Sequence, residues 1–270
     1  MVTIMEQDKN RLIYQVCLGE QANSKLYKKC IESVSAYCKK YDIVHYVQKS
    51  PRLRIAPDPF KTNRSKEATA KHGGYLPIYE KENAFDLLGQ YDQIAIIDAD
   101  IYIRDTAPNI FDDMDCKCAF GAVVERDMPI NDQYKAKIKN YSAMQYRTLQ
   151  SKIDFEPNEL GYEFFNMGMI VLNSEQFLPY LKGKDARGFI TQFDFQKFID
   201  GEGAWKWSTD QTLLNYFVRR DKVPTKKLDW KWNGLFSANT KIKECHFVHF
   251  FLKDKLPNRG ENVEELMKLI

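Results

Sequence analysis

Two aspartates at the end of an apolar run are the residues of this chain best suited to chemistry. Residues 94–103 read IAIIDADIYI, with Asp98 and Asp100 spaced two apart. In an extended segment, residues i and i+2 point the same way, so both carboxylates face one spot at the mouth of a hydrophobic strand. Two like charges in a half-dry site would raise each other's pKa or destabilise the fold unless a divalent cation neutralises them. The pattern predicts a metal that holds a phosphorylated substrate.

The segments that must position these acids predict an α/β fold. Residues 12–18 are predicted as a buried strand, 24–41 as an amphipathic helix and 43–47 as a second strand. This order is typical of a parallel βαβ unit. The uninterrupted apolar residues 94–97 predict a central strand covered on both faces. Ligands of open α/β sheets bind beyond the carboxyl ends of such strands, which is where the acids lie.

The remaining elements follow from periodicity and flanking residues. A long loop on the substrate side is predicted at residues 50–76, and a polar and aromatic stretch at 127–154 is predicted to cover the site. The other predicted elements are helices at 78–88, 189–198 and 210–218, strands at 119–124, 164–173 and 245–252, and an exposed amphipathic tail helix at 261–270.

Composition narrows the class of protein. With 270 residues and a net charge of +3, the chain suits one large domain, and no dense basic tract indicates nucleic-acid binding. The six cysteines form no CxxC pair, so most are predicted to be reduced core residues, and Cys116 and Cys118 are interpreted as structural thiols. No signal peptide or membrane-spanning run is recognised. We therefore expect a soluble, cytoplasmic protein.

Four separated motifs give the chain a resemblance to a known family. They are IAIIDADIYI, FFNMGMIVLN at residues 164–173, STDQTLLN at 208–215 and HFVHFFLKDKLP at 246–257. In this order they resemble the strand ending in DxD, the FNxGxxLIN strand, the DQxxLN segment and the HxxGxxKPW segment of metal-dependent glycosyltransferases of the GT-A fold. The glycogenin-like family is the most similar. The resemblance implies a single GT-A domain with a mixed, mostly parallel sheet flanked by helices.

The resemblance also implies the ligands of a metal. In that family the two acids bind manganese on the donor diphosphate, so Mn²⁺, or Mg²⁺, is expected at Asp98 and Asp100. His249 would be the third protein ligand. His246 is the competing choice, but a spacing of three in an extended segment places the two histidines on opposite faces. Both should therefore not bind one ion.

Further residues are assigned to the substrates by the same resemblance. Asn166 would lie near the donor sugar and the acceptor, Asp210 and Gln211 next to the transferred sugar, and Lys81 and Lys255 on the donor. The predicted catalytic residues are Asp210 and Asn166, and the predicted substrate contacts are Lys81, Leu18, Gly19, Ala99, Gln211 and Lys255. The last motif departs from the family, because large residues follow His249 and a leucine separates Lys255 from the proline.

Each of these residues also has a purely structural interpretation. Lys81 stands between two glutamates, and a solvated helix face explains it almost as well. Asp210 is also explained as an N-terminal helix acid that complements the dipole, and His249 as a packed core histidine. Trp205 and Trp207 fit either the core or a platform that stacks on an acceptor sugar.

The predicted function is transfer of a hexose from a nucleotide diphosphate sugar, in the first place a UDP-sugar, to a saccharide or other hydroxyl acceptor, with retention of configuration. A polar leader (1–10), a nucleotide-sugar-binding half (11–125), an acceptor-side half (126–257) and a tail (258–270) are expected. One alternative is a phosphohydrolase of the haloacid dehalogenase type, which fits poorly because Ile101 and Tyr102 follow the second acid. The other is a non-catalytic nucleotide-sugar-binding protein, suggested by the altered last motif.

Overall fold

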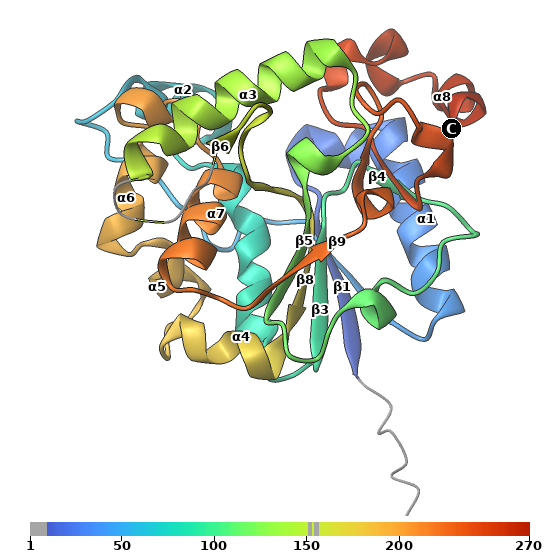
Figure 1. Cartoon of the computed structure of the whole chain (residues 1–270), viewed down its shortest axis with the longest axis horizontal. Coiled ribbons are helices and arrows are strands. Elements are labelled where there is room, and N and C mark those ends of the chain that lie inside the picture. Colours follow the sequence, from blue (N-terminus) through green and yellow to red (C-terminus); the bar gives the residue numbers. More distant parts are fainter. Residues whose placement is uncertain (1–9, 151–152, 154–156) are drawn as a thin grey trace, which may run out of the picture.

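A six-stranded sheet in the order β2-β1-β3-β8-β5-β9 forms the centre of the molecule (Figure 1). The structure is a computed structural model that describes residues 10–150, 153 and 157–270. Of the segments predicted above, residues 1–9 of the polar leader and residues 151, 152 and 154 of the covering stretch lie outside the described residues. The strands of this sheet are β1 (Arg11–Val16), β2 (Val44–Gln48), β3 (Gln93–Ile97), β5 (Phe120–Val124), β8 (Phe165–Asn173) and β9 (Thr225–Leu228).

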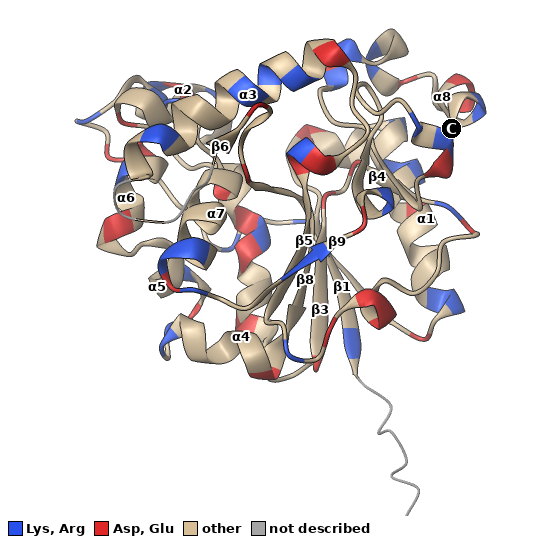
Figure 2. Cartoon of the chain, viewed as in Figure 1, with Lys and Arg blue, Asp and Glu red and all other residues tan. Residues whose placement is uncertain are grey.

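The sheet is mixed because β8 runs antiparallel to both of its neighbours, β3 and β5, whereas the other pairs are parallel. Every residue of β3, β5 and β8 is buried, as expected for strands covered on both faces. Figure 2 shows these strands without charged residues between helices that carry many. This architecture is the predicted one: an α/β domain with a mostly parallel sheet.

A second sheet, in the order β10-β11-β4, continues the chain beyond the two acids. Its strands are β4 (Ile101–Ile103), β10 (Gly234–Leu235) and β11 (Phe247–His249), and a short hairpin is formed by β6 (Pro157–Asn158) and β7 (Gly161–Tyr162). Strand β11 pairs antiparallel with β4, so that His249 lies opposite Ile101. The pairing brings the last sequence motif to the end of the DxD strand.

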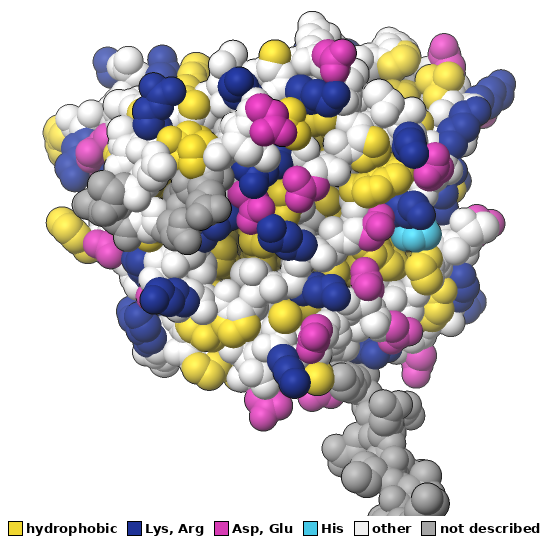
Figure 3. All heavy atoms as spheres, viewed as in Figure 1, with side chains coloured by type: hydrophobic (Ala, Val, Ile, Leu, Met, Phe, Trp, Pro, Cys, Tyr) yellow, Lys and Arg dark blue, Asp and Glu magenta, His cyan; other side chains and the backbone are white. Residues whose placement is uncertain are grey.

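Helices cover both faces of the central sheet, with α1 on one side and α4 to α7 on the other (Figure 1). Their bounds are α1 (Lys25–Lys40), α2 (Asn63–His72), α3 (Asp132–Tyr146), α4 (Ser174–Leu181), α5 (Ala186–Ile190), α6 (Phe193–Asp200), α7 (Asp210–Arg220) and α8 (Val263–Leu269). In the described part of the chain, no helix is long and apolar enough to cross a bilayer. The face in Figure 3 mixes side chains of both charge signs.

One continuous apolar core runs from β1 to β11, which agrees with a single domain. A smaller cluster joins the tail helix α8 to α1, because Leu266 is buried against the group that contains Leu26 and Cys30. The predicted tail helix is thus amphipathic, but its apolar face is covered. All six cysteines are free thiols, and four are buried.

Three predicted elements are wrong. The loop at residues 50–76 contains helix α2, whose only buried residues are Ser65 and Ala68, so no apolar period marks it. The predicted helix at 78–88 is a 3₁₀ segment, η2 (Pro77–Leu87). The predicted helix at 189–198 is two helices, α5 and α6, that are separated at residues 191–192.

Candidate active site

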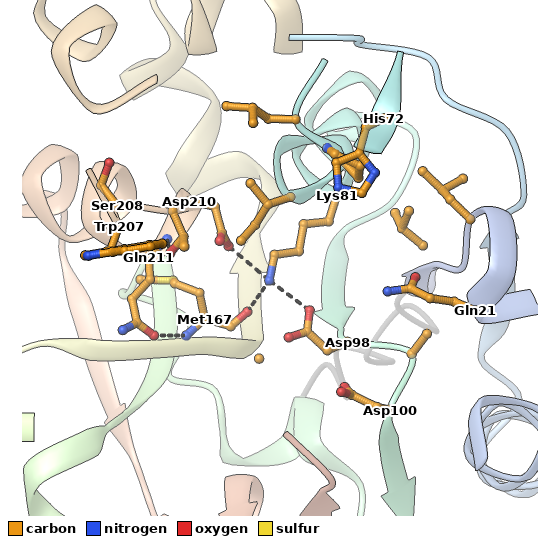
Figure 4. A pocket seen from close by; sticks show the side chains of 18 of the residues that line it. Gln21, His72, Lys81, Asp98, Asp100, Met167, Trp207, Ser208, Asp210 and Gln211 are labelled. Atoms are coloured by element: carbon orange, nitrogen blue, oxygen red, sulfur yellow. Dashed lines mark hydrogen bonds and ion pairs between the residues drawn. The ribbon is translucent and has the colours of Figure 1, made fainter. Parts of the chain in front are cut away.

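A cavity of about 610 Å³ opens at the carboxyl end of β3. Five of the predicted metal and catalytic residues line it, namely Asp98, Asp100, His249, Asp210 and Asn166, as do the predicted contacts Lys81, Leu18, Ala99 and Gln211. Figure 4 shows Lys81 extended between Asp210 and Asp98, with Gln21 and His72 on other walls. The fold therefore gathers residues from far-apart motifs around one space.

Asp98, Asp100 and His249 form a cluster suited to a cation. Each offers a ligand atom, and these atoms lie within 4.8 Å of one another. His249 Nε2 lies 3.3 Å from Asp100 Oδ1 and 3.7 Å from Asp98 Oδ2. Two carboxylates and one imidazole are a donor set that suits Mn²⁺. Mg²⁺ also binds carboxylates, but it prefers oxygen ligands to nitrogen ligands. The residues present thus fit a divalent metal.

Backbone pairing explains why these three side chains meet. The N–H of Asp98 donates to the carbonyl of Gly168 at 2.8 Å, and the N–H of Phe250 donates to the carbonyl of Asp100 at 3.0 Å. The acids are thereby held between β8 and β11. Gly168 also leaves room for the imidazole, because a Cβ at this position would lie 2.5 Å from His249 Nδ1. No larger residue fits there without moving His249.

Lys81 joins carboxylates from two elements. Its Nζ lies 2.8 Å from Asp98 Oδ1 and 3.0 Å from Asp210 Oδ2, and it donates to the carbonyl of Met167 at 2.7 Å. Burial lowers the pKa of Lys81, but the Asp210 and Asp98 carboxylates outweigh burial and raise the pKa above its usual value. Lys81 is therefore a fixed positive charge at the edge of the cluster.

The segment that carries Lys81 is buried, so the solvated-helix interpretation is wrong. Glu80 and Glu82 are 0% and 1% exposed. The carboxylate of Glu80 accepts hydrogen bonds from three successive backbone N–H groups, those of Arg52, Leu53 and Arg54, at 2.6–3.0 Å. A buried carboxylate needs such partners. Glu80 thus ties η2 to the loop that follows β2, and Lys81 extends from this anchored segment into the cavity.

Helix α7 presents Asp210 at its first turn. The side chain of Thr209 caps the helix by accepting from the N–H of Gln211 at 3.2 Å. Gln211 and Asn215 lie one turn apart and hydrogen-bond the backbone of β8, with Gln211 Oε1 accepting from the N–H of Met167 and Asn215 Oδ1 from that of Phe165. Asp210 is consequently 2% exposed and fixed against Lys81.

The carboxyl groups of the site differ in their pKa. Burial raises the pKa of Asp210, and the charge of Asp98 adds to the rise against the opposing effect of Lys81. Burial also acts to raise the pKa of Asp100, but His249 outweighs it and the net shift is downward. Burial lowers the pKa of His249, but Asp100 outweighs it and the net shift is upward. The cluster holds more negative charge than its own side chains neutralise.

Asn166 lines the cavity from β8, and both ends of its amide are engaged. Its Nδ2 donates to Glu125 Oε2 at 2.8 Å, and its Oδ1 accepts from the N–H of Gly168 at 2.9 Å and from Asn233 Nδ2 at 2.7 Å. Asn233 in turn lies 3.1 Å from His249 Nδ1. Asn166 is therefore linked through Asn233 to His249, on the side of the imidazole that faces away from Asp98 and Asp100.

Two predicted contacts do not reach the cavity. Gly19 lies just outside its wall, and Lys255 lies exposed in the 3₁₀ turn η9 (Lys253–Lys255). His246 also stays outside, because its ring packs 4.8 Å from Trp232. Of the two tryptophans, Trp205 donates to the Gln145 carbonyl and is a packing residue, whereas Trp207 is 59% exposed and lines the cavity.

Helix α2 contributes a wall that the sequence did not reveal. Arg64, Glu67 and His72 line the cavity from it. Arg64 fastens the helix across the opening, since its guanidinium donates to four carbonyls, those of Phe198, Ile199, Lys206 and Ser208, at 2.5–3.2 Å. No motif marks these residues. A helical interpretation of the charged stretch 63–72 would have been the only available signal.

Two further residues were missed, Glu125 and Asn233. Glu125 follows β5 and is 4% exposed, and Asn233 is fully buried. Each contacts a partner far away in the sequence, so no local spacing identifies them. A glutamate directly after an apolar strand was the one visible sign for Glu125.

The fold has counterparts among solved structures. An active-site mutant of LgtC has a TM-score of 0.54 at 13% identity, with 96% of this chain and 94% of that chain covered. The galactosyltransferase LgtC in complex with donor and acceptor sugar analogs has a TM-score of 0.49 at 15% identity, with 96% and 94% covered. The bifunctional glycosyltransferase WbbM has a TM-score of 0.52 at 12% identity, with 98% of this chain and 52% of that chain covered.

No protein-family model and no curated protein sequence matches the chain. Identities of 12–13% with the two structures above a TM-score of 0.5 support the fold alone. The chain therefore has the GT-A fold, as its four motifs predicted, and it shares this fold with the bifunctional glycosyltransferase WbbM and with LgtC.

Proposed function

We propose that this chain is a metal-dependent glycosyltransferase that moves a hexose from a nucleotide diphosphate sugar, preferably a UDP-sugar, to a saccharide or other hydroxyl acceptor. One observation carries the proposal. The ligand atoms of Asp98, Asp100 and His249 lie within 4.8 Å of one another at a cavity that also holds Lys81 and Asp210. This is the charge pattern that a metal-bound diphosphate needs.

The donor diphosphate is proposed to lie between this cluster and Lys81. A divalent metal bound there would neutralise the negative charge that develops as the nucleotide diphosphate leaves. Asp98, Asp100 and His249 would hold it. Lys81 is already protonated and held by Asp98 and Asp210, so its charge is in place before the donor arrives. A lysine suits this position because its ammonium acts as a point charge toward phosphate oxygens.

Asp210 and Gln211 are proposed to face the transferred sugar. The carboxyl of Asp210 would orient a sugar hydroxyl or stabilise positive character on the anomeric carbon. Its buried position at the first turn of α7 fixes it for either task. Retention is proposed, with the leaving phosphate accepting the proton of the acceptor hydroxyl, so that no strong protein base is needed.

The remaining walls are assigned to the rest of the substrates. Leu18 and Ala99 line the side of the cavity next to β1 and β3, which suits the nucleotide. Trp207 lines the opposite side with an exposed ring, which suits a saccharide acceptor because sugar rings stack on aromatic faces. Gly19 and Lys255 would join the donor site only if the segments that carry them moved inward.

A thermal-shift panel tests the proposal. UDP, GDP, CDP and their sugars are compared with and without Mn²⁺, on the wild type and on Asp100→Ala. We expect metal-dependent stabilisation of the wild type by one nucleotide series, strongest for UDP, because ligands that bind the folded state raise the melting temperature. Stabilisation by none of them would overturn the proposal. Transfer or hydrolysis of the donor sugar would exclude the non-catalytic alternative.

Asp98→Asn separates the proposal from the phosphohydrolase alternative. A phosphohydrolase of the haloacid dehalogenase type uses the first acid as a nucleophile, so this change would abolish its turnover through loss of the nucleophile. In a transferase the same change should chiefly weaken binding of the metal and the donor. The GT-A fold supports the transferase.

A further inference from the structure

A line of buried hydrogen-bonding side chains runs behind the metal cluster from Glu125 to His249. Glu125 Oε2 accepts from Asn166 Nδ2 at 2.8 Å, Asn166 Oδ1 accepts from Asn233 Nδ2 at 2.7 Å, and Asn233 Oδ1 lies 3.1 Å from His249 Nδ1. Asn233 is 0% exposed and does not line the cavity. Its amide therefore contacts neighbouring side chains and is out of reach of a substrate in the cavity.

The direction of every hydrogen bond in this line is fixed by one backbone group. The N–H of Gly168 can only donate, so the Asn166 atom that lies 2.9 Å from it is the oxygen Oδ1. Asn233 must then turn its Nδ2 toward that oxygen, because two facing acceptors would repel. This leaves Asn233 Oδ1 toward His249, and the Nδ1 atom that faces it must carry the hydrogen.

We infer that Asn233, oriented by Asn166, holds His249 in the tautomer with its hydrogen on Nδ1, so that the lone pair of Nε2 points at the spot shared by Asp98 and Asp100. Nε2 is the ring nitrogen nearer to that spot, at 3.3 Å from Asp100 Oδ1. The inference rests on the proposed function in one respect, namely that a divalent cation occupies the spot. A metal can bind only the nitrogen that carries no hydrogen.

Asn233 and Asn166 are in this respect positioning residues. Gly168 acts with them in two ways, since its N–H sets the polarity of the amides and its missing side chain gives the imidazole its place. Outer-shell partners of metal-bound histidines fix the orientation of the ring and the tautomer in just this manner. The asparagine of the second sequence motif thus gains a task beside its proposed contact with the sugar.

The tautomer can be read directly in the metal-free protein. The chain has four histidines, so long-range ¹H–¹⁵N spectra of protein labelled at histidine resolve each imidazole, and His249→Gln assigns the signal of interest. Without a metal, Asp100 and Asp98, at 3.3 and 3.7 Å from Nε2, compete with Asn233 for the imidazole hydrogen. At alkaline pH, where the imidazoles are neutral, we expect Asn233 to keep this hydrogen on Nδ1 of His249. A hydrogen on Nε2 in the wild type would overturn the inference without the need for any further variant.

Two substitutions at Asn233 extend this measurement. Asn233→Leu keeps the size but removes both hydrogen bonds, and we expect a mixture of tautomers. Asn233→Asp loses the hydrogen bond to Asn166 Oδ1 but still offers an oxygen to Nδ1, and we expect it to keep the single tautomer. A wild-type tautomer in Asn233→Leu would contradict the assignment.

Metal affinity gives the second readout. Titration with Mn²⁺, followed by electron paramagnetic resonance, should show binding about 10–100-fold weaker in Asn233→Leu. Asn173→Leu is the matched control, because Asn173 is also buried and bonded through both ends of its amide, to Gln93 and to the carbonyl of Cys118, at the other end of β8. Its Mn²⁺ affinity should equal that of the wild type. Equal affinities in both variants would overturn the inference.

The two hypotheses fail in different ways. If the wild type binds no Mn²⁺ but His249 carries its hydrogen on Nδ1 and loses this preference in Asn233→Leu, the proposed function fails and the assignment of Asn233 stands. If Mn²⁺ and a nucleotide bind but the tautomer is reversed, the assignment fails and the proposed function stands.

Discussion

Two charged clusters that share helix α7 differ in how their carboxylates are neutralised. The Asp98 cluster consists of Asp98, Asp100, Asp210, Lys81 and His249. The Glu163 cluster consists of Glu163, Arg126, Arg219 and Lys227. Helix α7 contributes Asp210 from its first turn to one and Arg219 from its last turn to the other. Two adjacent residues also have different partners, since Glu125 accepts a hydrogen bond from Asn166 and Arg126 pairs with Glu163.

The ratio of charges separates the two clusters. Three cationic side chains surround one carboxylate in the Glu163 cluster; burial acts to raise the pKa of Glu163, but Lys227 and Arg219 outweigh it and lower the pKa. Three carboxylates share one ammonium and one imidazole in the Asp98 cluster, and the pKa of Asp210 is raised. The carboxylate of Glu163 is fully neutralised within the chain. The Asp98 cluster keeps an excess of buried negative charge, which is expected where a ligand supplies the missing cation.

Removing one cationic side chain from each cluster should give the largest difference in unfolding free energy between the two clusters. Lys81→Met leaves the buried Asp210 and the partly buried Asp98 without their ammonium, and we expect a loss of about 3–5 kcal/mol of unfolding free energy. Lys227→Met is the matched change, and it leaves Glu163 with two arginines at a more exposed site, so a loss of at most about 1 kcal/mol is expected. Urea unfolding measures both. Losses of equal size would show that the clusters do not differ as described.

Adding a cation should stabilise only the cluster that lacks one. At about one hundred times its dissociation constant, Mn²⁺ should add about 2.7 kcal/mol to the unfolding free energy of the wild type. Glu163→Gln should keep this increment, because Glu163 does not face the metal site. Asp100→Asn should lose it. The same urea titrations with and without Mn²⁺ give the three increments, and an unchanged increment in Asp100→Asn would place the metal elsewhere.

Neutralising one carboxylate in each cluster should change stability in opposite directions. A raised pKa means that folding disfavours the charged form of Asp210, so Asp210→Asn should leave the metal-free protein as stable as before or up to about 1 kcal/mol more stable. Glu163→Gln should destabilise by a similar amount, because the lowered pKa means that folding favours the charge. Under the proposed function, Asp210→Asn should also lower turnover at least about 100-fold. Thermal unfolding and donor-sugar transfer measure the two effects.

Local patterns were sufficient to predict much of the fold and part of the site. The DxD strand, β8 and the start of α7 each show as a short apolar run or a capped helix with its polar residues at fixed spacing. The predictions of Asp98, Asp100, His249, Lys81 and Asp210 as functional residues remain proposals, but the fold does bring these side chains together.

The missed parts depend on contacts that no local pattern encodes. Strand β9 reads TKKL and is only partly buried, so it has no apolar run. The segment η2 has helical periodicity in the sequence, but it forms 3₁₀ turns in which Glu80 binds the backbone of residues 52–54. Asn233 meets Asn166 across 67 positions, which spacing cannot reveal.

Acidification should give the smallest change in unfolding free energy, and this change tests the Glu163 cluster. Because the pKa of Glu163 is lowered in the folded protein, its stabilisation is fully present above the ordinary glutamate pKa of 4.5 and is lost as the pH falls through the lowered value. The effect should stay below about 1 kcal/mol, because solvent screens this partly exposed cluster. The difference in unfolding free energy between the wild type and Glu163→Gln isolates it from the other carboxylates. That difference should shrink steadily below pH 4.5. A difference that stays constant or grows on acidification would show that the cations around Glu163 do not stabilise its charge, and the contrast with Asp210 would then be lost.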